Sequence, residues 1–378
     1  MSLVRNKIRL ARSIVGIKEV QALRRIIMDD GYLGMGREVH LFEEDLKGFL
    51  SGKGDVVCVN SGTAALHLAV MAIVKPGDEV LVPSFTFVAS FQAIKAAGAV
   101  PVACDIDPET LLLDLKDAVR RITRRTKVVM PVHYAGAVGD LKAVYSFARE
   151  HKLRVVEDAA HAFGTTYQNK KIGSFGDIAC FSFDGIKNIT SAEGGAVVTA
   201  DKKVLEFVKD ARLLGVHQDT EKRFSGQRSW EFEVYHQGYR YHMSNLFAAI
   251  GRTQLKKFHG FARARQMLSS RYQKELKGIQ GLGLIPMDIK TIVPHIFPVF
   301  VKNNRRDALR AFLAERGIES GIHYYPSHRL KFFARSGVKC PHADAAYAMV
   351  LSLPLHPGLS GVEQGVVIKT IKEFFSHE

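Results

Sequence analysis

A lysine stands in a short connection directly after an apolar run, where its amine could react as well as carry charge. Residues 181–188 read FSFDGIKN, with Lys187 as the seventh, and a glycine pair follows at 194–195. Partial burial favours a neutral amine, and a neutral amine can form an imine with a carbonyl group. Ser182, at the end of the apolar run, could donate to a phosphate. Because a lysine can also extend its stem to reach water, this segment alone leaves both interpretations open.

A glycine-containing turn joins an apolar run to a helical pattern much earlier in the chain. Residues 59–66 read VNSGTAAL, so Gly62 and Thr63 open the expected helix. The first backbone N–H groups of a helix are unpaired and carry partial positive charge, which suits a phosphate. Gly62 lets a ligand approach the backbone closely, and the hydroxyls of Ser61 and Thr63 add donors. An ordinary N-cap by Asn60 or Ser61 explains the same pattern equally well.

An acidic pair closes a third apolar run. Residues 155–161 read VVEDAAH, with Asp158 at the end of an expected strand. In open α/β sheets, ligands bind outside the carboxyl ends of the strands. A carboxylate at that place can keep a pyridinium nitrogen protonated, which is what makes pyridoxal phosphate an electron sink. Asp158 could instead cap the next turn, and His161 taken alone could be a structural histidine.

The turn, the acid and the lysine must be positioned by the elements that precede them. Seven runs read as strands, at residues 55–59, 79–83, 100–105, 127–133, 154–158, 179–183 and 195–199. Helical patterns separate the first five, at residues 63–74, 87–97, 113–122 and 141–151. Strands that alternate with helices indicate an α/β fold with a mainly parallel sheet covered on both faces.

The pattern changes after residue 200. It predicts a helix at 204–214, a long loop or hairpin at 215–241, a long helix at 244–266, a strand at 295–301 and a helix at 305–316. We therefore expect a large domain at residues 1–255 and a smaller C-terminal α/β domain at residues 256–378.

The composition of the 378 residues fits a globular protein. The longest apolar run, at 64–74, is too short to cross a bilayer, and the first residues lack the layout of a secretory signal. The four cysteines form no close pair, which favours buried thiols in a reducing cytoplasm over disulfides or a metal site. Lys and Arg outnumber Asp and Glu by 53 to 38, for a formal charge of +15. That charge would suit nucleic acid, a small polyphosphorylated substrate or only a solvated basic surface.

Several of these segments resemble the DegT/DnrJ-type sugar aminotransferases, which are fold-type I pyridoxal-phosphate enzymes of the aspartate aminotransferase superfamily. The resemblance covers nearly the whole chain and is carried by residues 61–66, 77–89, 157–162, 173–177, 181–188, 321–326 and 351–355. It implies pyridoxal 5'-phosphate as the cofactor. It also implies transfer of an amino group from glutamate to the keto carbon of a nucleotide-linked sugar, as in amino-sugar and polysaccharide biosynthesis.

The resemblance implies a role for each matched side chain. Lys187 would form an imine with the cofactor and move the proton during the transfer, and Asp158 would pair with the pyridine nitrogen. The other matched residues would contact the ring and the phosphate: Phe87 stacked on the ring, His161 near the phenolic oxygen, and Gly62, Thr63 and Ser182 at the phosphate.

Two segments depart from the family pattern. Residues 238–243 read GYRYHM where the family commonly has Gly-Tyr-Asn-Tyr-Arg-Met. The family's Asn reaches the phosphate of the neighbouring subunit's cofactor, so Arg240 would act across a homodimer interface, on that phosphate or on the substrate diphosphate. Residues 183–186 read FDGI where many members have Phe-Tyr-Pro-Thr or similar, which would mark a subgroup.

Basic and aromatic side chains are the candidates for substrate contact. Arginine forks suit a diphosphate and an aromatic ring can stack on a nucleobase, so Arg228 and Trp230, shortly before Arg240, are expected to bind the nucleotide. The same stretch could instead only pack across a dimer interface. His323, Tyr324 and His328 are further candidates for contacts to the sugar or the nucleotide.

Lys187 and the net charge bear on two alternatives to an aminotransferase. A sugar dehydratase of the same fold would have histidine in place of the lysine, so Lys187 argues against it. A regulatory protein that binds nucleic acid would suit the charge of +15, would bind DNA in a salt-sensitive way and would not need Lys187. We expect neither nucleic acid nor a membrane as a partner.

Overall fold

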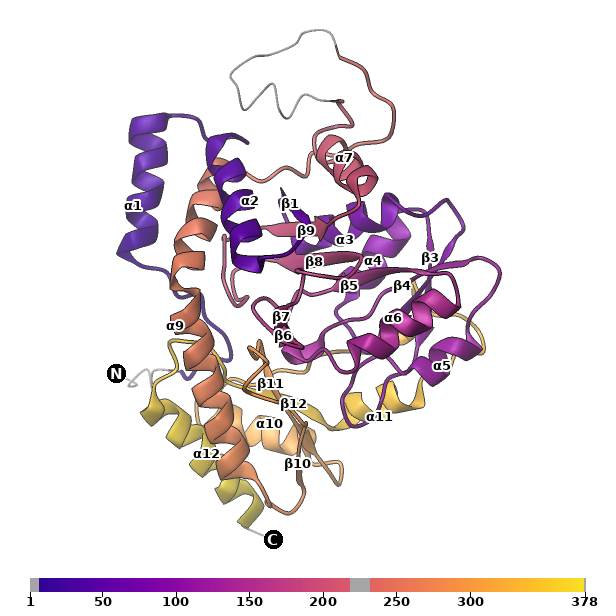
Figure 1. Ribbon diagram of the computed structural model, residues 1–378. Helices are drawn as coiled ribbons and strands as arrows, with labels where there is room; N and C mark the ends of the chain where they lie inside the picture. Colours follow the sequence, from indigo (N-terminus) through magenta and orange to yellow (C-terminus); the bar gives the residue numbers. More distant parts are fainter. Residues whose placement is uncertain (1–6, 218–231, 377–378) are drawn as a thin grey trace.

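The computed structural model describes residues 7–217 and 232–376, and its largest element is a seven-stranded sheet (Figure 1). The strand order is β1-β9-β8-β5-β4-β2-β3. The strands are β1 Asp55–Val59, β2 Glu79–Pro83, β3 Val100–Cys104, β4 Thr126–Val129, β5 Arg154–Asp158, β8 Ile178–Ser182 and β9 Gly195–Thr199. The pairs from β3 to β8 are parallel, while β9 runs antiparallel to both β1 and β8. The predicted α/β fold with a mainly parallel sheet is confirmed.

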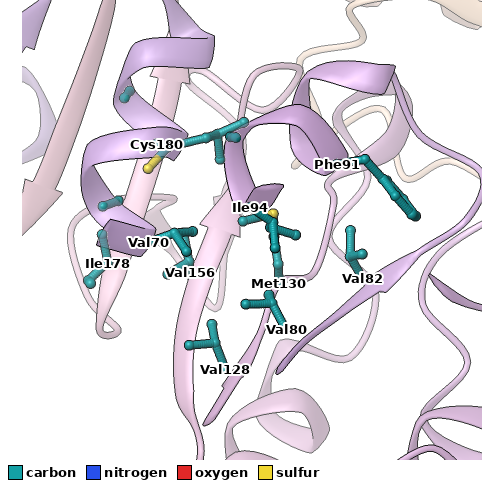
Figure 2. Packing of buried hydrophobic residues seen from close by; sticks show 14 of the residues in the cluster. Val70, Val80, Val82, Phe91, Ile94, Val128, Met130, Val156, Ile178 and Cys180 are labelled. Atoms are coloured by element: carbon teal, nitrogen blue, oxygen red, sulfur yellow. The ribbon is translucent and has the colours of Figure 1, made fainter. Parts of the chain in front are cut away.

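Helices cover both faces of this sheet, and each face has its own hydrophobic core. Helices α3 Gly62–Met71, α4 Val88–Ala96 and α7 Lys202–Ala211 pack on one face, part of which Figure 2 shows. Helices α2 Arg37–Leu50, α5 Leu115–Arg120, α6 Leu141–Glu150 and the first half of α9 Asn245–Leu276 pack on the other. Side chains alternate along each strand, so Val57 and Cys58 of β1 enter opposite cores. Strands buried on both faces therefore read as continuous apolar runs.

A smaller antiparallel sheet forms the C-terminal part of the molecule. Its strands β10 Leu282–Leu284, β11 Phe297–Val301 and β12 Val350–Leu353 pack with α10 Arg306–Glu315 and α12 Gly361–Ser376. Ile8 joins the same core and pairs with Ile318, so the start of the chain lies against its C-terminal part. The remaining elements are α1 Ile17–Arg25, α11 Pro341–Met349, the short strands β6 Thr166–Tyr167 and β7 Lys170–Lys171, the π-helix η1 Ile26–Asp30, and the 3-10 helices η2 Tyr134–Gly136 and η3 Ser327–Arg329.

Helix α9 connects the two parts. Phe258 packs in a core of the large sheet, whereas Leu268, Tyr272 and Leu276 pack in the core of the small sheet. The predicted boundary at residue 255 lies inside this helix. The division of the chain into two domains at that residue stays a prediction.

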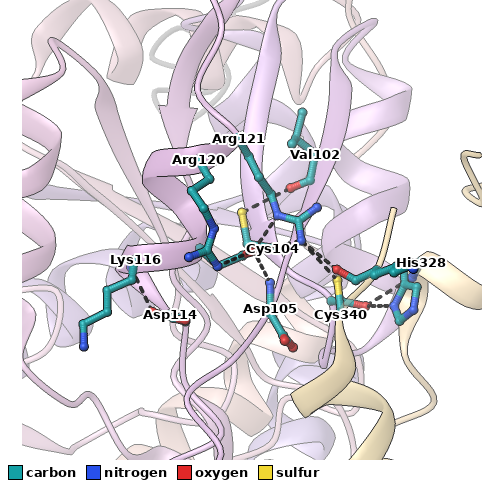
Figure 3. A network of polar contacts seen from close by, with 12 residues as sticks. Val102, Cys104, Asp105, Asp114, Lys116, Arg120, Arg121, His328 and Cys340 are labelled. Atoms are coloured by element: carbon teal, nitrogen blue, oxygen red, sulfur yellow. Dashed lines mark hydrogen bonds and ion pairs between the residues drawn. The ribbon is translucent and has the colours of Figure 1, made fainter. Parts of the chain in front are cut away.

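A polar network attaches the C-terminal part to the end of β3 (Figure 3). The carboxylate of Asp105 accepts hydrogen bonds from the backbone N–H groups of His342 at 3.0 Å and Ala343 at 2.9 Å, which caps helix α11. Arg121 of α5 donates to the Lys339 carbonyl at 2.8 Å. These bonds hold the start of α11 against the large sheet.

Two further sequence predictions can be compared with the structure. The four cysteines are buried free thiols, which confirms the expectation of unpaired cysteines. Within the described ranges, no helix has both the length and the apolar character needed to span a membrane.

Candidate active site

A cavity of about 490 Å³ opens where β1, β5 and β8 end. Residues that follow these three strands line it together with side chains from the C-terminal part of the chain. Nine of the residues singled out from the sequence meet here: Gly62, Thr63, Phe87, Asp158, His161, Ser182, Lys187, His323 and Tyr324. The parallel strands explain the convergence, because their carboxyl ends share one edge of the sheet.

The turn after β1 presents hydrogen-bond donors to the cavity. Ser61 caps helix α3 by accepting a hydrogen bond from the Ala64 N–H at 3.1 Å. The backbone N–H groups of Gly62 and Thr63 have no acceptor among the described residues. A Cβ added to Gly62 would lie 2.7 Å from the Cβ of Ser182, so only glycine allows the turn this close to β8. Ser61 therefore caps the helix, while the backbone N–H groups of Gly62 and Thr63 remain available to bind an anion.

The acid at the end of β5 is held in a fixed orientation. Asp158 is buried, and its Oδ2 accepts a hydrogen bond from the Ser90 hydroxyl at 2.7 Å while its Oδ1 accepts one from the Ala160 N–H at 3.2 Å. The Ser90 hydroxyl lies 3.1 Å from that of Thr86. Ser90 was not among the residues indicated by the sequence, although it follows Phe87 by one helical turn and so lies on the same side of α4.

The environment of Lys187 favours a neutral amine. The residue lies in the turn after β8, where its backbone N–H donates to the Asp184 carbonyl at 3.0 Å. Burial lowers the pKa of the amine to about 8, against the opposing effect of the Asp158 and Asp184 carboxylates. The charge of Arg265 also lowers this pKa. A substantial fraction of the amine is therefore neutral near physiological pH.

The protonation of His161 follows from its two hydrogen bonds. The Ala135 N–H donates to Nδ1 at 3.3 Å, and Nε2 lies 2.9 Å from the Tyr324 hydroxyl oxygen. Burial, and after it the charge of Lys187, holds the pKa of His161 well below its usual range, so the ring is neutral. Its proton must then be on Nε2 and be donated to Tyr324. The hydroxyl hydrogen of Tyr324 is left for another acceptor.

Two more histidines line the same wall of the cavity. His323 Nδ1 lies 2.8 Å from the Ser352 hydroxyl, and burial lowers the pKa of His323 to about 4. His295, which was not among the residues indicated by the sequence, lies beside His161 with ring centres 4.3 Å apart and ring planes tilted by 42°. The sequence around His295, just before β11, does not indicate a place in this site, because the histidine is far in sequence from the other residues of the site.

Some predicted residues do not line the cavity. His328 Nδ1 lies 2.6 Å from the Ser84 hydroxyl, and its Nε2 lies 3.6 Å from a carboxylate oxygen of Asp344. Arg240 is exposed and also stands outside the lining. Arg228 and Trp230 lie outside the described residues. The functional roles expected of all four stay predictions.

The family of the chain follows from comparison with known proteins. Residues 15–372 match the model of the DegT/DnrJ/EryC1/StrS aminotransferase family. The chain belongs to this family. It is 35% identical over 372 residues to the spore coat polysaccharide biosynthesis protein SpsC of Bacillus subtilis, and the match covers 95% of each chain.

Solved structures of family members have the same fold. The aminotransferase TlmJ from Streptoalloteichus hindustanus superposes with a TM-score of 0.90 at 32% identity, over 98% of this chain and 99% of that one. The sugar aminotransferase Spr1654 from Streptococcus pneumoniae, described as putative, matches at 27% identity in its PLP form, with a TM-score of 0.89 and coverage of 98% and 99%. The 378-residue chain is thus a sugar aminotransferase of fold type I that depends on pyridoxal 5'-phosphate.

The residues of the cavity fit this cofactor. Its phosphate needs several donors at one point, and the free amides of Gly62 and Thr63 lie beside Ser182. Its pyridine nitrogen needs a carboxylate, and Asp158 faces the cavity with its orientation fixed by Ser90. The aldehyde needs a neutral amine, for which the low pKa of Lys187 is suited.

Proposed function

We propose that this enzyme transfers an amino group from glutamate to the keto carbon of a nucleotide-linked sugar. The observation that carries the proposal is the cavity in which Lys187, Asp158 and the open N-terminus of α3 meet. Membership in a sugar aminotransferase family supports the sugar as acceptor. The name of the relative SpsC supports a place in the biosynthesis of a surface polysaccharide or glycoconjugate.

Each site residue receives a role in this proposal. Bound pyridoxal phosphate supplies the electron sink that stabilises negative charge at the reacting carbon. Lys187 binds the cofactor and moves the proton at the carbon that carries the amino group, and Asp158 holds the proton on the pyridine nitrogen. The other residues bind and orient the cofactor: Phe87 covers the ring, His161 lies near the phenolic oxygen, and Gly62, Thr63 and Ser182 hold the phosphate.

A nucleotide substrate also needs cations for its diphosphate. Among the described residues that line the cavity, Lys187 is the one lysine or arginine. Arg240 and Arg228 are therefore proposed as the further cations, with Trp230 stacked on the base. His323, Tyr324 and His328 are proposed to contact the sugar or the nucleotide.

The exposed position of Arg240 supports a homodimer with shared active sites. An arginine outside the cavity of its own subunit can act on the cavity of a neighbour. An apolar surface is available for such an interface, because Ile17 and Val20 of α1 are 68% and 58% exposed and Met28 of η1 is 69% exposed. Helix α1 lies on the outer side of α9 (Figure 1). We also infer a location in the cytoplasm, which the four free thiols support.

The proposed bond between the cofactor and Lys187 can be tested on the purified protein. Addition of pyridoxal phosphate should give a yellow protein, and borohydride should fix the cofactor on the peptide that contains Lys187. Lys187→Ala should lose the colour and the amino transfer, whereas the exposed Lys203→Ala on α7 should keep both. A colourless protein, or a Lys187→Ala variant that still transfers the amino group, would contradict the proposal.

The substrate is identified by a separate screen. UDP-, dTDP- and GDP-linked keto-sugars are each incubated with glutamate, and 2-oxoglutarate and the amino sugar are measured. Formation of both products with one nucleotide class supports the proposal. Amino transfer to small keto acids alone would exclude a nucleotide-sugar acceptor.

A further inference from the structure

Helix α9 places a buried arginine beneath the turn that carries Lys187. Arg265 is 2% exposed. Its Nη1 donates to the His295 carbonyl at 2.9 Å and to the Pro294 and Leu355 carbonyls at 3.3 Å each, and its Nη2 donates to the Ile186 carbonyl at 3.5 Å. One guanidinium therefore joins the lysine turn to two segments of the C-terminal part of the chain.

The charge of this guanidinium is not neutralised. No Asp or Glu in residues 7–217 and 232–376 forms an ion pair with Arg265, and burial alone lowers its pKa, to about 10. The side chain therefore remains charged at physiological pH. A buried charge without a countercharge is costly, because it has lost the hydration that it has in water. The arrangement therefore calls for a functional reason as well as a structural one.

We infer that Arg265 is a positioning residue for Lys187: its buried guanidinium fixes the lysine turn through the Ile186 carbonyl and adds a fixed positive charge next to this turn. The inference rests on the proposed role of Lys187 in binding the cofactor. Arg265 does not line the cavity, so it acts through Lys187 and not by contact with a ligand.

Charged groups face Lys187 from several elements. Asp158 at the end of β5 and Asp184 in the turn itself both favour the protonated amine, whereas Arg265 on α9 disfavours it. The neighbouring histidines, His161 and His295, have pKa values well below their usual range, so they add no positive charge. The pKa of His323 is likewise lowered, to about 4. Burial is the largest cause of the lowered pKa of Lys187, and the charge of Arg265 acts in the same direction as burial and against the two acids.

A pair of substitutions separates the charge of Arg265 from its shape. Arg265→Lys keeps the charge and shortens the donor, and Arg265→Gln keeps donors and removes the charge. The full-length, cofactor-free protein is treated over a pH series with a small acylating reagent that reacts with neutral amines. The acylated fraction of the peptide that contains Lys187 is then measured by mass spectrometry. The pH at which acylation of Lys187 is half-maximal should rise on the order of one pH unit in Arg265→Gln. In Arg265→Lys it should stay near the wild-type value.

Another buried arginine provides a control for the loss of a buried guanidinium, although its Nε also pairs with the Asp307 carboxylate at 2.6 Å. Arg306 is 7% exposed, and its Nη1 donates to the carbonyls of Tyr347 at 2.8 Å and Val350 at 3.4 Å. It does not line the cavity, so Arg306→Gln should leave the Lys187 midpoint unchanged. Equal shifts in both Arg265 variants, or none in Arg265→Gln, would overturn the inference. If Arg265→Gln does not fold, Arg265→Met takes its place with the same expectation.

A second measurement keeps this inference separate from the proposed function. In the cofactor-loaded protein, the pH midpoint of the visible absorption should also rise in Arg265→Gln and stay in Arg265→Lys. The acylation experiment requires no bound cofactor, so it tests the effect of Arg265 even if pyridoxal phosphate does not bind. A shifted acylation midpoint in a protein that takes up no cofactor would reject the proposed function and leave the inference standing.

Discussion

At the residue scale, the proposed binding of the cofactor by Lys187 predicts how cofactor uptake depends on pH. Burial lowers the pKa of the amine from 10.5 to about 8, and only the neutral amine can attack the aldehyde. Uptake by cofactor-free protein should therefore accelerate about tenfold per pH unit up to about pH 8 and then level off. Stopped-flow absorbance over a pH series measures this rate. A rate that keeps rising to about pH 10 would mean that the amine keeps its ordinary pKa.

The hydroxyl of Tyr324 provides another prediction at this scale. His161 donates to its oxygen, so the hydroxyl hydrogen is available to a ligand in the cavity. Tyr324→Phe should lower kcat about ten- to hundredfold while the cofactor stays bound. Steady-state kinetics and the absorption spectrum measure the two effects.

A tyrosine elsewhere in the molecule is the control for this substitution. Tyr272 is buried in the core of the small sheet, and its hydroxyl donates to the Pro354 carbonyl at 3.0 Å. Tyr272→Phe should keep kcat and lower the free energy of unfolding by about 1 kcal/mol. Equal losses of kcat in both variants would show that Tyr324 acts only through packing.

Residues differ in how far their function could be predicted from the sequence. Asp158 and Lys187 could be found because a charged residue at the end of an apolar strand stands out. Ser90 and Arg265 could not, because their partners Asp158 and Ile186 are 68 and 79 positions away. Only the folded chain brings these partners together.

At the element scale, the junction of β1 and α3 depends on the absence of a side chain. An alanine Cβ at Gly62 would lie 2.7 Å from the Ser182 Cβ, so the turn would have to move away from β8. Gly62→Ala should weaken cofactor binding by about tenfold or more, since overpacking costs about 1–3 kcal/mol. A cofactor titration followed by absorbance measures the change in Kd.

Gly48 in helix α2 is the matched glycine. A Cβ added there would meet no atom within 4 Å, so Gly48→Ala should leave the Kd unchanged. It should also raise the free energy of unfolding by about 0.5–1 kcal/mol, because alanine is the better helix former. An unchanged Kd in Gly62→Ala would mean that the turn tolerates a side chain and needs no close approach to β8.

The boundaries of some helices and strands are determined by local sequence, and those of others by tertiary contacts. The strands at 55–59, 79–83, 154–158 and 195–199 have the predicted bounds. The fourth strand was expected to reach residue 133 but ends at Val129, because Pro131 has no N–H to continue the ladder. Helix α9 was expected to end at residue 266 but runs to Leu276, because Tyr272 and Leu276 are buried in the core of the small sheet.

At the scale of the whole molecule, the cavity depends on parts of the chain that are far apart in sequence. Residues at or after the ends of β1, β5 and β8 line the cavity, among them Gly62, Asp158 and Lys187, and residues 322–324 line it from the C-terminal part. The motifs near the large sheet could be predicted from the sequence. The closing wall could be assigned only as a set of candidates, since no local pattern determines how the small sheet packs on the large one.

The proposed homodimer with shared active sites leads to a specific prediction for the assembly. Lys187→Ala and Arg240→Ala subunits should each form inactive or weakly active homodimers. If Arg240 acts on the partner's site, a mixed dimer contains one site with both defects and one site with neither. Mixing the two variants after reversible dissociation should therefore restore activity, measured as formation of 2-oxoglutarate. If Arg240 acted on the site of its own subunit, every site in the mixed dimer would keep one defect, and mixing would restore nothing.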